Sequence, residues 1–362
     1  MRCPTLPELP APPKGKQGWP WTEEAPQLPD TMPHGQPWPR VSIVTPSYNQ
    51  GRFIEETIRS VLLQGYPDLE YIIMDGGSTD GAVDIIKRYE KWLTYWLSER
   101  DRGQSDAINK GWRMAKGEIL AYLNSDDIYT PSAVETGVNY LVAHPDISMV
   151  YGDGDFINES GEVTEHCRAQ DLDLKRLLCS YDHVPQPTVF FRREVLDAVG
   201  YLDEDLHLAM DLDYWIRICS RFRAGRVRET LAVMHLHPDA KFVCRYHEGL
   251  GEYLHILGKF YSNPELPADI RGFRRKAYSS VHLRASVDFV SARKRREAVK
   301  NLATAVRLHP GCLFDLGTGL HLVRLALGEK AAQGLMKLGR RPGMMRLLRA
   351  SQLKYFGTDM PE

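Results

Sequence analysis

Two adjacent acidic residues, Asp126 and Asp127, are the strongest local sign of chemistry in this chain of 362 residues. They follow an apolar run, 119–123, that has the pattern of a buried strand. Because adjacent carboxylates repel, a loop that exposes both needs a compensating cation or backbone amides. Mg²⁺ or Mn²⁺ bound to a diphosphate takes one or two protein carboxylates, with phosphate oxygens and water completing the shell. The structural alternative is that Ser125 or Asp126 caps a helix starting near Pro131.

A second carboxylate loop, 75–80, also follows an apolar run, 69–74. Asp75 could accept a hydrogen bond from the N–H of a nucleobase, while the two glycines beside it let the main chain approach a ligand closely. The alternative is a turn and helix cap formed by 78–80. That alternative explains Asp80 better than it explains Asp75.

Two further positions could act on a substrate. Asp211 lies in the first turn of a predicted helix, where a carboxylate favours the helix dipole for structural reasons alone, but it could also deprotonate a hydroxyl as a general base. His235 and His237 would point the same way only if their segment is extended, and we expect at most one of them to be a ligand.

The elements that must position these residues alternate between strand and helix. Strands are predicted at 41–46, 69–74, 93–98, 119–123, 148–151 and 188–191, and helices at 53–62, 83–89 and 105–115. This alternation predicts an α/β fold with a mainly parallel sheet and right-handed crossovers. Ligands of such sheets bind beyond the carboxyl ends of the strands, where both carboxylate loops lie.

Composition divides the chain into three parts. Residues 1–40 carry 11 of the 23 prolines without an apolar period, so we expect a disordered or polyproline-like lead-in. Residues 41–245 form the predicted α/β domain, and 246–362 are helical and basic. Within 271–350 there are 18 Lys/Arg against 4 Asp/Glu, a local net charge of +14. That charge suits either a solvated helical surface or peripheral contact with an anionic membrane.

The other global features exclude several classes of protein. The net charge of −1 gives no reason to expect nucleic-acid binding, and no run of about 20 apolar residues could span a membrane. Six scattered cysteines without a CxxC pair argue against zinc and disulfides, and predict a cytoplasmic protein whose membrane contact, if any, is at the inner face. The chain lacks GxSxG, GxGxxG and GxxxxGK[ST].

Three stretches, 41–81, 98–127 and 200–218, resemble in this order the inverting glycosyltransferases of family 2. The resemblance implies the GT-A fold of nucleotide-diphospho-sugar transferases: a mixed, mostly parallel central sheet flanked by helices, here with a helical C-terminal extension. Residues 41–130 would be the nucleotide-sugar-binding half and 131–245 the acceptor half. The implied reaction transfers a sugar from a nucleotide-diphosphate sugar to a hydroxyl of a saccharide or lipid-linked acceptor with inversion, in polysaccharide or glycolipid synthesis.

The resemblance also assigns roles to individual residues. Six would bind the nucleotide sugar: Thr45, Pro46, Tyr48, Asp75, Asp106 and Ser125. Three would hold a divalent metal, Mg²⁺ or Mn²⁺: Asp126, Asp127 and His237. Asp211 would be the catalytic base, and Trp215 with the segment 183–187 would shape the acceptor pocket unless they are ordinary core and loop.

Two departures from the family pattern keep alternatives open. Asn124 stands where the family has the first acid of Asp-x-Asp, and Met210 stands where it has the glutamate before the base. A non-catalytic scaffold with a degenerate head would explain both. A sugar nucleotidyltransferase would also use magnesium and carboxylates, but it needs a glycine-rich basic loop where this chain has 45–50, and it would release pyrophosphate.

Overall fold

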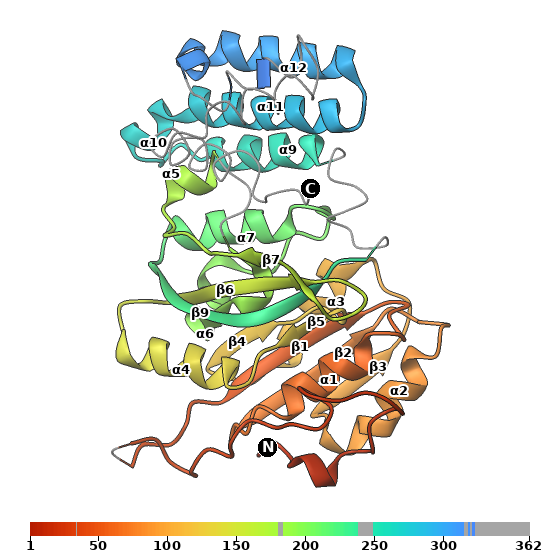
Figure 1. The fold of residues 1–362 in the computed structure, drawn as a ribbon. Helices are drawn as coiled ribbons and strands as arrows, with labels where there is room; N and C mark the ends of the chain where they lie inside the picture. The colour runs from red at the N-terminus through yellow and green to blue at the C-terminus, as the bar shows by residue number, and fades with distance from the viewer. Residues whose placement is uncertain (34, 180–183, 238–248, 315–317, 319–320, 323–362) are drawn as a thin grey trace, which may run out of the picture. The chain divides into compact units, whose positions relative to one another are not determined.

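The computed structural model describes residues 1–33, 35–179, 184–237, 249–314, 318 and 321–322. The chain divides into two compact units. Unit 1 comprises Met1–Leu172 and Val184–His237, and unit 2 comprises Asp173–His183 and Pro238–Glu362. Unit 1 carries the sheet, and unit 2 contains the helices coloured teal to blue in Figure 1. The predicted boundary at 245/246 lies outside the described residues.

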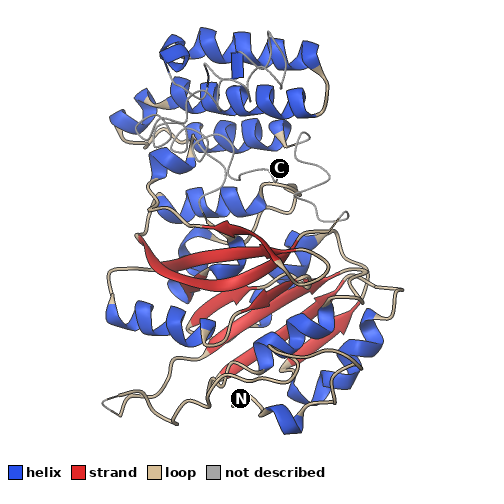
Figure 2. Cartoon of the chain, in the orientation of Figure 1, coloured by secondary structure: helices blue, strands red, loops and turns tan. Residues whose placement is uncertain are grey.

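A nine-stranded mixed sheet is the centre of unit 1 (Figure 2). Its strands are β1 (Val41–Ser47), β2 (Leu69–Asp75), β3 (Tyr95–Ser98), β4 (Ile119–Tyr122), β5 (Asp127–Tyr129), β6 (Met149–Ile157), β7 (Val163–Cys167), β8 (Phe190–Arg192) and β9 (Ala224–His235). The order is β3-β2-β1-β4-β8-β6-β9-β5, with β7 beside β6. Strands β5, β7 and β8 run against the other strands, so the sheet is mostly parallel as predicted.

Helices flank this sheet. In unit 1 they are α1 (Ile54–Leu62), α2 (Ala82–Tyr89), α3 (Gln104–Met114), α4 (Ala133–Ala143), α6 (Arg193–Val199) and α7 (Met210–Cys219). Every residue of β1 and β2 is buried, which is typical of parallel strands covered on both faces. A Cβ atom at Gly111 would lie 2.4 Å from Cγ1 of Val44, so only glycine lets α3 lie this close to β1.

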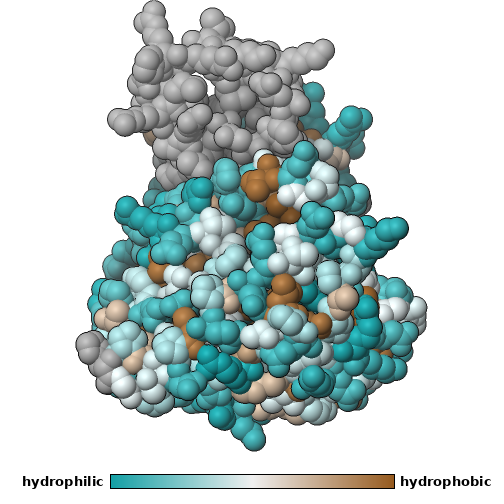
Figure 3. Space-filling view, turned by 60° about the horizontal axis from the view of Figure 1, so that its bottom comes forward, coloured by the Kyte–Doolittle hydropathy of each residue, from teal (hydrophilic) through white to brown (hydrophobic). Residues whose placement is uncertain are grey.

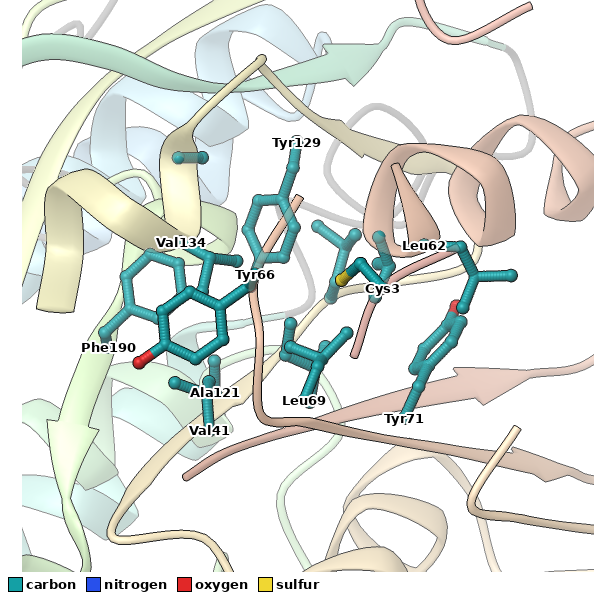
Figure 4. Close-up of a cluster of buried hydrophobic side chains, with 14 of the residues drawn as sticks. Cys3, Val41, Leu62, Tyr66, Leu69, Tyr71, Ala121, Tyr129, Val134 and Phe190 are labelled. Atoms are coloured by element: carbon teal, nitrogen blue, oxygen red, sulfur yellow. The ribbon is translucent and has the colours of Figure 1, made fainter. Parts of the chain in front are cut away.

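The N-terminal lead-in is ordered, in contrast to the disorder expected of it. Residues 1–33 and 35–40 run along unit 1, and their apolar side chains enter its core: Cys3, Leu9, Trp21, Leu28, Met32 and Trp38 are buried. Figure 4 shows Cys3 among the core side chains of Leu62, Tyr66 and Leu69. Burial raises the pKa of the Cys3 thiol to about 12. We call residues 1–33 and 35–40 the N-terminal strap. Its prolines stiffen the chain, but burial of the aromatic and aliphatic residues between them is what packs it against the core of unit 1.

A fully buried arginine holds the strap against α1. The guanidinium group of Arg59 donates to the carbonyl oxygens of Pro10 at 2.8 Å, Pro20 at 3.0 Å and Trp21 at 3.0 Å, and to the hydroxyl of Tyr89 at 3.1 Å. Because these oxygens have been withdrawn from water, the guanidinium must satisfy them. One side chain of α1 therefore pairs with three carbonyl groups of the strap.

Replacing Arg59 with methionine is expected to lower the free energy of unfolding by about 3–5 kcal/mol, because it leaves buried carbonyl oxygens unpaired. Urea unfolding followed by tryptophan fluorescence measures this loss. The matched control is Arg88→Met, since Arg88 is half-exposed and forms an ion pair with Glu55 at 2.9 Å; its cost should stay below about 1 kcal/mol. Equal midpoints for the Arg59 variant and the native protein would show that the strap is held by other contacts.

Unit 2 is helical, as expected. Its elements are α5 (Leu174–Leu177), α9 (Leu250–Tyr261), α10 (Ala268–Gly272), α11 (Arg274–Ser291) and α12 (Arg295–Leu308). Helices α11 and α12 form a close hairpin in which hydroxyls of one helix bond carbonyls of the other, Ser279 to Ala305 at 2.8 Å and Ser286 to Ala298 at 2.7 Å. Among the described residues, no helix is long and apolar enough to cross a membrane.

The surface is mostly hydrophilic on the face that Figure 3 presents, where apolar side chains form scattered patches. In unit 2 the basic residues of the hairpin turn, 293–296, are exposed, as are Lys300 and Arg307 of α12. The remainder of the basic stretch, 323–350, lies outside the described residues.

Candidate active site

The two carboxylate loops meet at one edge of the sheet, as the sequence predicted. In the parallel register Ser47 at the end of β1 lies beside Asp75 at the end of β2, and Val44 lies beside Tyr122 at the end of β4. The N–H of Gly76 donates to the carbonyl of Ser47 at 2.8 Å, and this bond joins the loop after β1 to the loop after β2. The carboxyl ends of β1, β2 and β4 thus form a single edge where ligands of such sheets bind.

Asp75 organises its own loop. One carboxylate oxygen accepts from the N–H groups of Gly77 at 3.1 Å and Ser78 at 2.9 Å and from the hydroxyl of Ser98 at 2.6 Å, while the other accepts from the Ser78 hydroxyl at 2.5 Å. The carboxylate is buried, so these donors compensate its desolvation. Asp80 precedes Gly81, the N-cap of α2, and accepts from the N–H groups of Ala82 at 3.2 Å and Gly51 at 2.7 Å, so it holds the turn before the helix and is not its N-cap.

Replacing Asp75 with asparagine should destabilise the protein by about 2–3 kcal/mol, because an amide NH₂ would face N–H or O–H donors. The comparison is Asp80→Asn, whose carboxylate accepts from Gly51 and Ala82 in an exposed loop and should cost less than about 1 kcal/mol. Urea unfolding of both variants measures the two losses of stability. An Asp75 variant as stable as the Asp80 variant would contradict this account of the loop.

The residues predicted around the nucleoside divide between core and surface. Thr45 is buried, with its hydroxyl 3.1 Å from that of Tyr71, and Pro46 is buried beside it. Tyr48 is 62% exposed at the mouth of the same loop. Of these three side chains, only the Tyr48 ring is at the surface, where it could meet a base.

Asp106 lies in the first turn of α3 and is buried. It accepts from the N–H of Arg102 at 3.1 Å and lies 3.3 Å from the ammonium of Lys110. Burial alone would raise the pKa of this carboxyl, but the N–H of Arg102 and the charges of Lys110 and Arg102 together lower it. Asp101 has the opposite balance, because burial is the largest effect and raises its pKa.

Asn124 connects three parts of the site. Its amide oxygen accepts from Gln104 at 2.6 Å, and its amide nitrogen donates to Asp127 at 3.0 Å and to Gln186 at 3.1 Å. Gln186 also donates to the carbonyl of Tyr122 at 2.9 Å. An amide can donate and accept at once, whereas an ionised carboxylate only accepts. The asparagine in place of the family's acid therefore has a structural role as a bridge.

The adjacent carboxylates Asp126 and Asp127 are in different surroundings. The Asp126 side chain is 23% exposed, and its Oδ2 lies 3.1 Å from Nε2 of His237. Asp127 is buried and turned to Asn124; burial, followed by the charge of Asp126, raises the pKa of Asp127 well above its usual value. The helix-cap alternative is wrong, because α4 begins only at Ala133 and Asp127 begins β5.

Two anchors fix the turn that holds this pair. The hydroxyl of Thr57 in α1 contacts the carbonyl oxygens of Ser125 at 3.0 Å and Asp127 at 2.8 Å, and Ser125 is itself buried. On the other side β5 pairs with β9, which places Asp127 beside Met234. That pairing brings the extended segment of His235 and His237 to the turn, and both histidines contact Asp126.

Asp211 is the second residue of α7, half-buried in the first turn, and its Oδ1 accepts from the N–H of Leu212 at 2.9 Å. The charges of Asp211 and Asp127 both reach the Tyr122 phenol, whose pKa is raised first by burial and then by these two charges. Met210 is buried, with its sulfur 2.9 Å from the hydroxyl of Ser105. The methionine thus ties the start of α7 to α3.

Comparison with known proteins gives this site its context. The sequence profile described as Glycosyl transferase family 2 matches residues 42–200. Over 181 residues the chain is 30% identical to an uncharacterized glycosyltransferase of Mycobacterium tuberculosis, covering 49% of this chain and 68% of that protein. The chain belongs to glycosyltransferase family 2. It is a nucleotide-sugar glycosyltransferase, so the alternative of a sugar nucleotidyltransferase is set aside.

Two further likenesses bear on this family 2 glycosyltransferase. It is 39% identical over 107 residues to the Bacillus subtilis protein TuaG, whose name assigns it to teichuronic acid biosynthesis; the match covers 29% of this chain and 42% of TuaG. In fold it is similar to the mannosyltransferase PcManGT of Pyrobaculum calidifontis, solved in complex with GDP-Man and Mn²⁺, with a TM-score of 0.54, 19% identity and coverage of 88% and 85% of the two chains. The GT-A-like fold expected from the sequence is confirmed.

Reasoning from the sequence missed several residues of the glycosyltransferase site. Gln104 and Gln186 hold Asn124, although Gln186 stood in the segment considered for the acceptor pocket; His183 of that segment lies outside the described residues. Trp215 is buried in the core. Phe53 contacts His235 and His237, whereas the sequence indicates only that it lies in a helix. No local pattern marks these residues, because strands far apart in sequence bring them together.

Proposed function

We propose that this enzyme transfers a sugar from a nucleotide-diphosphate sugar to a hydroxyl of a saccharide or lipid-linked acceptor, with inversion, in polysaccharide or glycolipid synthesis. One observation carries the proposal: Asp126, in the turn that follows β4, lies 3.1 Å from His237, and β4 is one of the strands whose carboxyl ends share an edge with the loop of Asp75. The GDP-Man and Mn²⁺ bound to PcManGT and the biosynthetic name of TuaG support the donor class and the pathway class.

A divalent metal fits the residues at this edge. Oδ2 of Asp126 and Nε2 of His237 are 3.1 Å apart, close to the edge of about 3 Å of an octahedron with bonds of about 2.1 Å. No group of three or more His, Cys, Asp or Glu side chains suited to a metal occurs in the described part of the chain, which matches a cation that takes its remaining ligands from phosphates and water. The nitrogen ligand favours Mn²⁺ over Mg²⁺.

The ligand set that we propose is Asp126 with His237. The family resemblance predicts Asp127 as a third ligand. Its carboxyl group is buried and accepts a hydrogen bond from Asn124, so we assign it to holding Asn124. When bound, the ion supplies charge neutralisation on the leaving diphosphate. The loop of Asp75 and the exposed ring of Tyr48 would bind the nucleoside, with Asp106 supporting the first turn of α3.

Asp211 is the residue that we assign to the acceptor. As general base it would take the proton of the acceptor hydroxyl while that oxygen attacks the anomeric carbon from the face opposite the leaving diphosphate. Binding both substrates in line supplies orientation, and a single displacement of this kind inverts the configuration.

A panel of UDP-, GDP- and dTDP-sugars tests the proposed function directly. Release of nucleoside diphosphate from one donor, abolished by EDTA and restored by Mn²⁺, is the expected result, and the anomeric configuration of the product by NMR reports inversion. Pyrophosphate release would instead indicate a nucleotidyltransferase. Absence of turnover, together with no metal-dependent protection against melting by any donor, would indicate a scaffold and overturn the proposal.

For the basic stretch 271–350 we propose contact with an anionic membrane surface at the inner face of the membrane. The exposed basic residues of 293–296, with Lys300 and Arg307, support it for the described part. Co-sedimentation with phosphatidylserine vesicles should fall as salt rises from about 0.05 to 0.5 M, because such attraction is screened. Binding that ignores both salt and lipid charge would contradict this contact.

A further inference from the structure

Asp126 is held at two different atoms by two histidines of one strand end. Nε2 of His237 lies 3.1 Å from its carboxylate Oδ2, and Nδ1 of His235 lies 2.7 Å from its main-chain oxygen. His235 is the last residue of β9 and His237 follows two residues later; both imidazoles contact the ring of Phe53, so they lie on the same side. One of them therefore meets the carboxylate, and the other meets the backbone that carries it.

The hydrogen bond of His235 fixes its tautomer. A carbonyl oxygen can only accept, so Nδ1 of His235 must carry the proton that it donates to Asp126. Its other nitrogen, Nε2, is 3.9 Å from a carboxylate oxygen of Glu56. Glu56 in turn accepts from the indole N–H of Trp21 in the N-terminal strap at 3.2 Å. His235 is thus hydrogen-bonded through Nδ1, and its Nε2 lies near Glu56 without a hydrogen bond to it.

A phenylalanine packs against both imidazoles. The ring centroid of Phe53 is 4.7 Å from that of His237, at 36°, and 4.9 Å from that of His235, at 39°. Phe53 directly precedes α1, whose Thr57 already anchors the turn of Asp126 through the neighbouring carbonyls. Side-chain rotation of either imidazole would have to displace this buried ring.

We propose that Phe53 and His235 are positioning residues that fix Asp126 and His237 as a preformed pair for the metal-bound diphosphate. His235 fixes the position of the Asp126 main chain through its Nδ1–H, and Phe53 fixes the orientation of both imidazole rings. Residues around a metal's ligands commonly act in this way, and their loss lowers metal affinity about 10–100-fold. The inference rests on the proposed metal-dependent function for its consequence, but the hydrogen bond itself does not require the metal.

Two isosteric variants of His235 separate its nitrogens. The amide nitrogen of asparagine can replace Nδ1, and that of glutamine can replace Nε2. Mn²⁺ affinity, measured from the EPR signal of free Mn²⁺ with UDP or GDP present, should stay within about 3-fold of native in His235→Asn and fall about 10–100-fold in His235→Gln. Equal affinities in the two variants, or the reverse order, would overturn the role of Nδ1.

Phe53→Leu tests the second positioning residue while keeping an apolar side chain in place. We expect Mn²⁺ affinity about 10-fold weaker with an unchanged circular dichroism spectrum. The control is His144→Ala, whose exposed imidazole stacks on Tyr140 at the end of α4 and should leave the affinity unchanged. Native affinity in Phe53→Leu would overturn the role of the ring.

A readout without metal keeps this inference separate from the proposed function. In ¹⁵N-histidine-labelled native protein, long-range ¹H–¹⁵N correlation should show the His235 imidazole as the Nδ1–H tautomer, with the signal identified by its absence in His235→Asn. The Nε2–H tautomer would overturn the inference even if the enzyme binds Mn²⁺. A protein that binds no Mn²⁺ but shows the Nδ1–H tautomer would contradict the proposed function alone.

Discussion

Replacing Asp126 with asparagine is expected to lower sugar transfer about 10²–10³-fold, with the fold unchanged. Asparagine keeps the shape of the side chain but removes the negative charge to which we assign binding of the metal ion. The side chain is 23% exposed and the turn is anchored through main-chain carbonyls by Thr57, so the loss should appear in kcat and in Mn²⁺ affinity and not in urea unfolding.

Asp127→Asn is the matched control, because it makes the same substitution one residue further on. Asp127 is buried and its carboxyl oxygen accepts from Asn124, which the amide oxygen of asparagine can also do. We expect less than a 10-fold loss of kcat. A larger loss in Asp127→Asn than in Asp126→Asn, from steady-state assays of both at saturating Mn²⁺, would reverse the assignment of the two carboxylates.

The strand pattern alone places both acids at this edge without distinguishing them, whereas the family resemblance favours Asp126 as the metal ligand. An apolar run ending in Asn-Ser-Asp-Asp predicts a strand and a loop, and a mainly parallel sheet collects such loops at one edge. Which acid turns outward is decided by the pairing of Asp127 with Met234, two residues more than 100 positions apart. The same pairing brings His237 to Asp126. Only the family resemblance suggested that contact.

The N-terminal strap shows the opposite limit. Eleven prolines among forty residues predict a disordered or polyproline-like chain, and the described residues of this region have little regular secondary structure but are packed on unit 1. Order comes from tryptophans and aliphatic residues that lie too irregularly to form a periodic pattern, and from Arg59 of α1, which binds the strap's carbonyl groups. An irregular segment can be ordered by a partner surface, which local periodicity does not report.

Replacing Asp211 with asparagine should lower kcat for sugar transfer about 10²–10⁴-fold, while the donor's KM changes less than about 3-fold. The reason is that the proposed base acts on the acceptor hydroxyl, not on the nucleotide. Initial rates over a range of donor and acceptor concentrations separate the two constants. Donor binding, measured as Mn²⁺-dependent protection against melting, should be retained.

The control for this variant is a neighbouring aspartate in the same turn of the helix but with another partner. Asp213 is also in the first turn of α7, is buried, and pairs with Arg217 at 2.8 Å. If Asp211 served only the helix dipole, Asp211→Asn would cost about 0.3–1 kcal/mol of stability and leave kcat alone. Asp213→Asn should instead lose stability with kcat largely intact, because Asp213 supports the helix and does not meet the acceptor. A common loss of stability with equal kcat in both variants would remove Asp211 from the mechanism, and the base would have to be sought among the other acids near Tyr122.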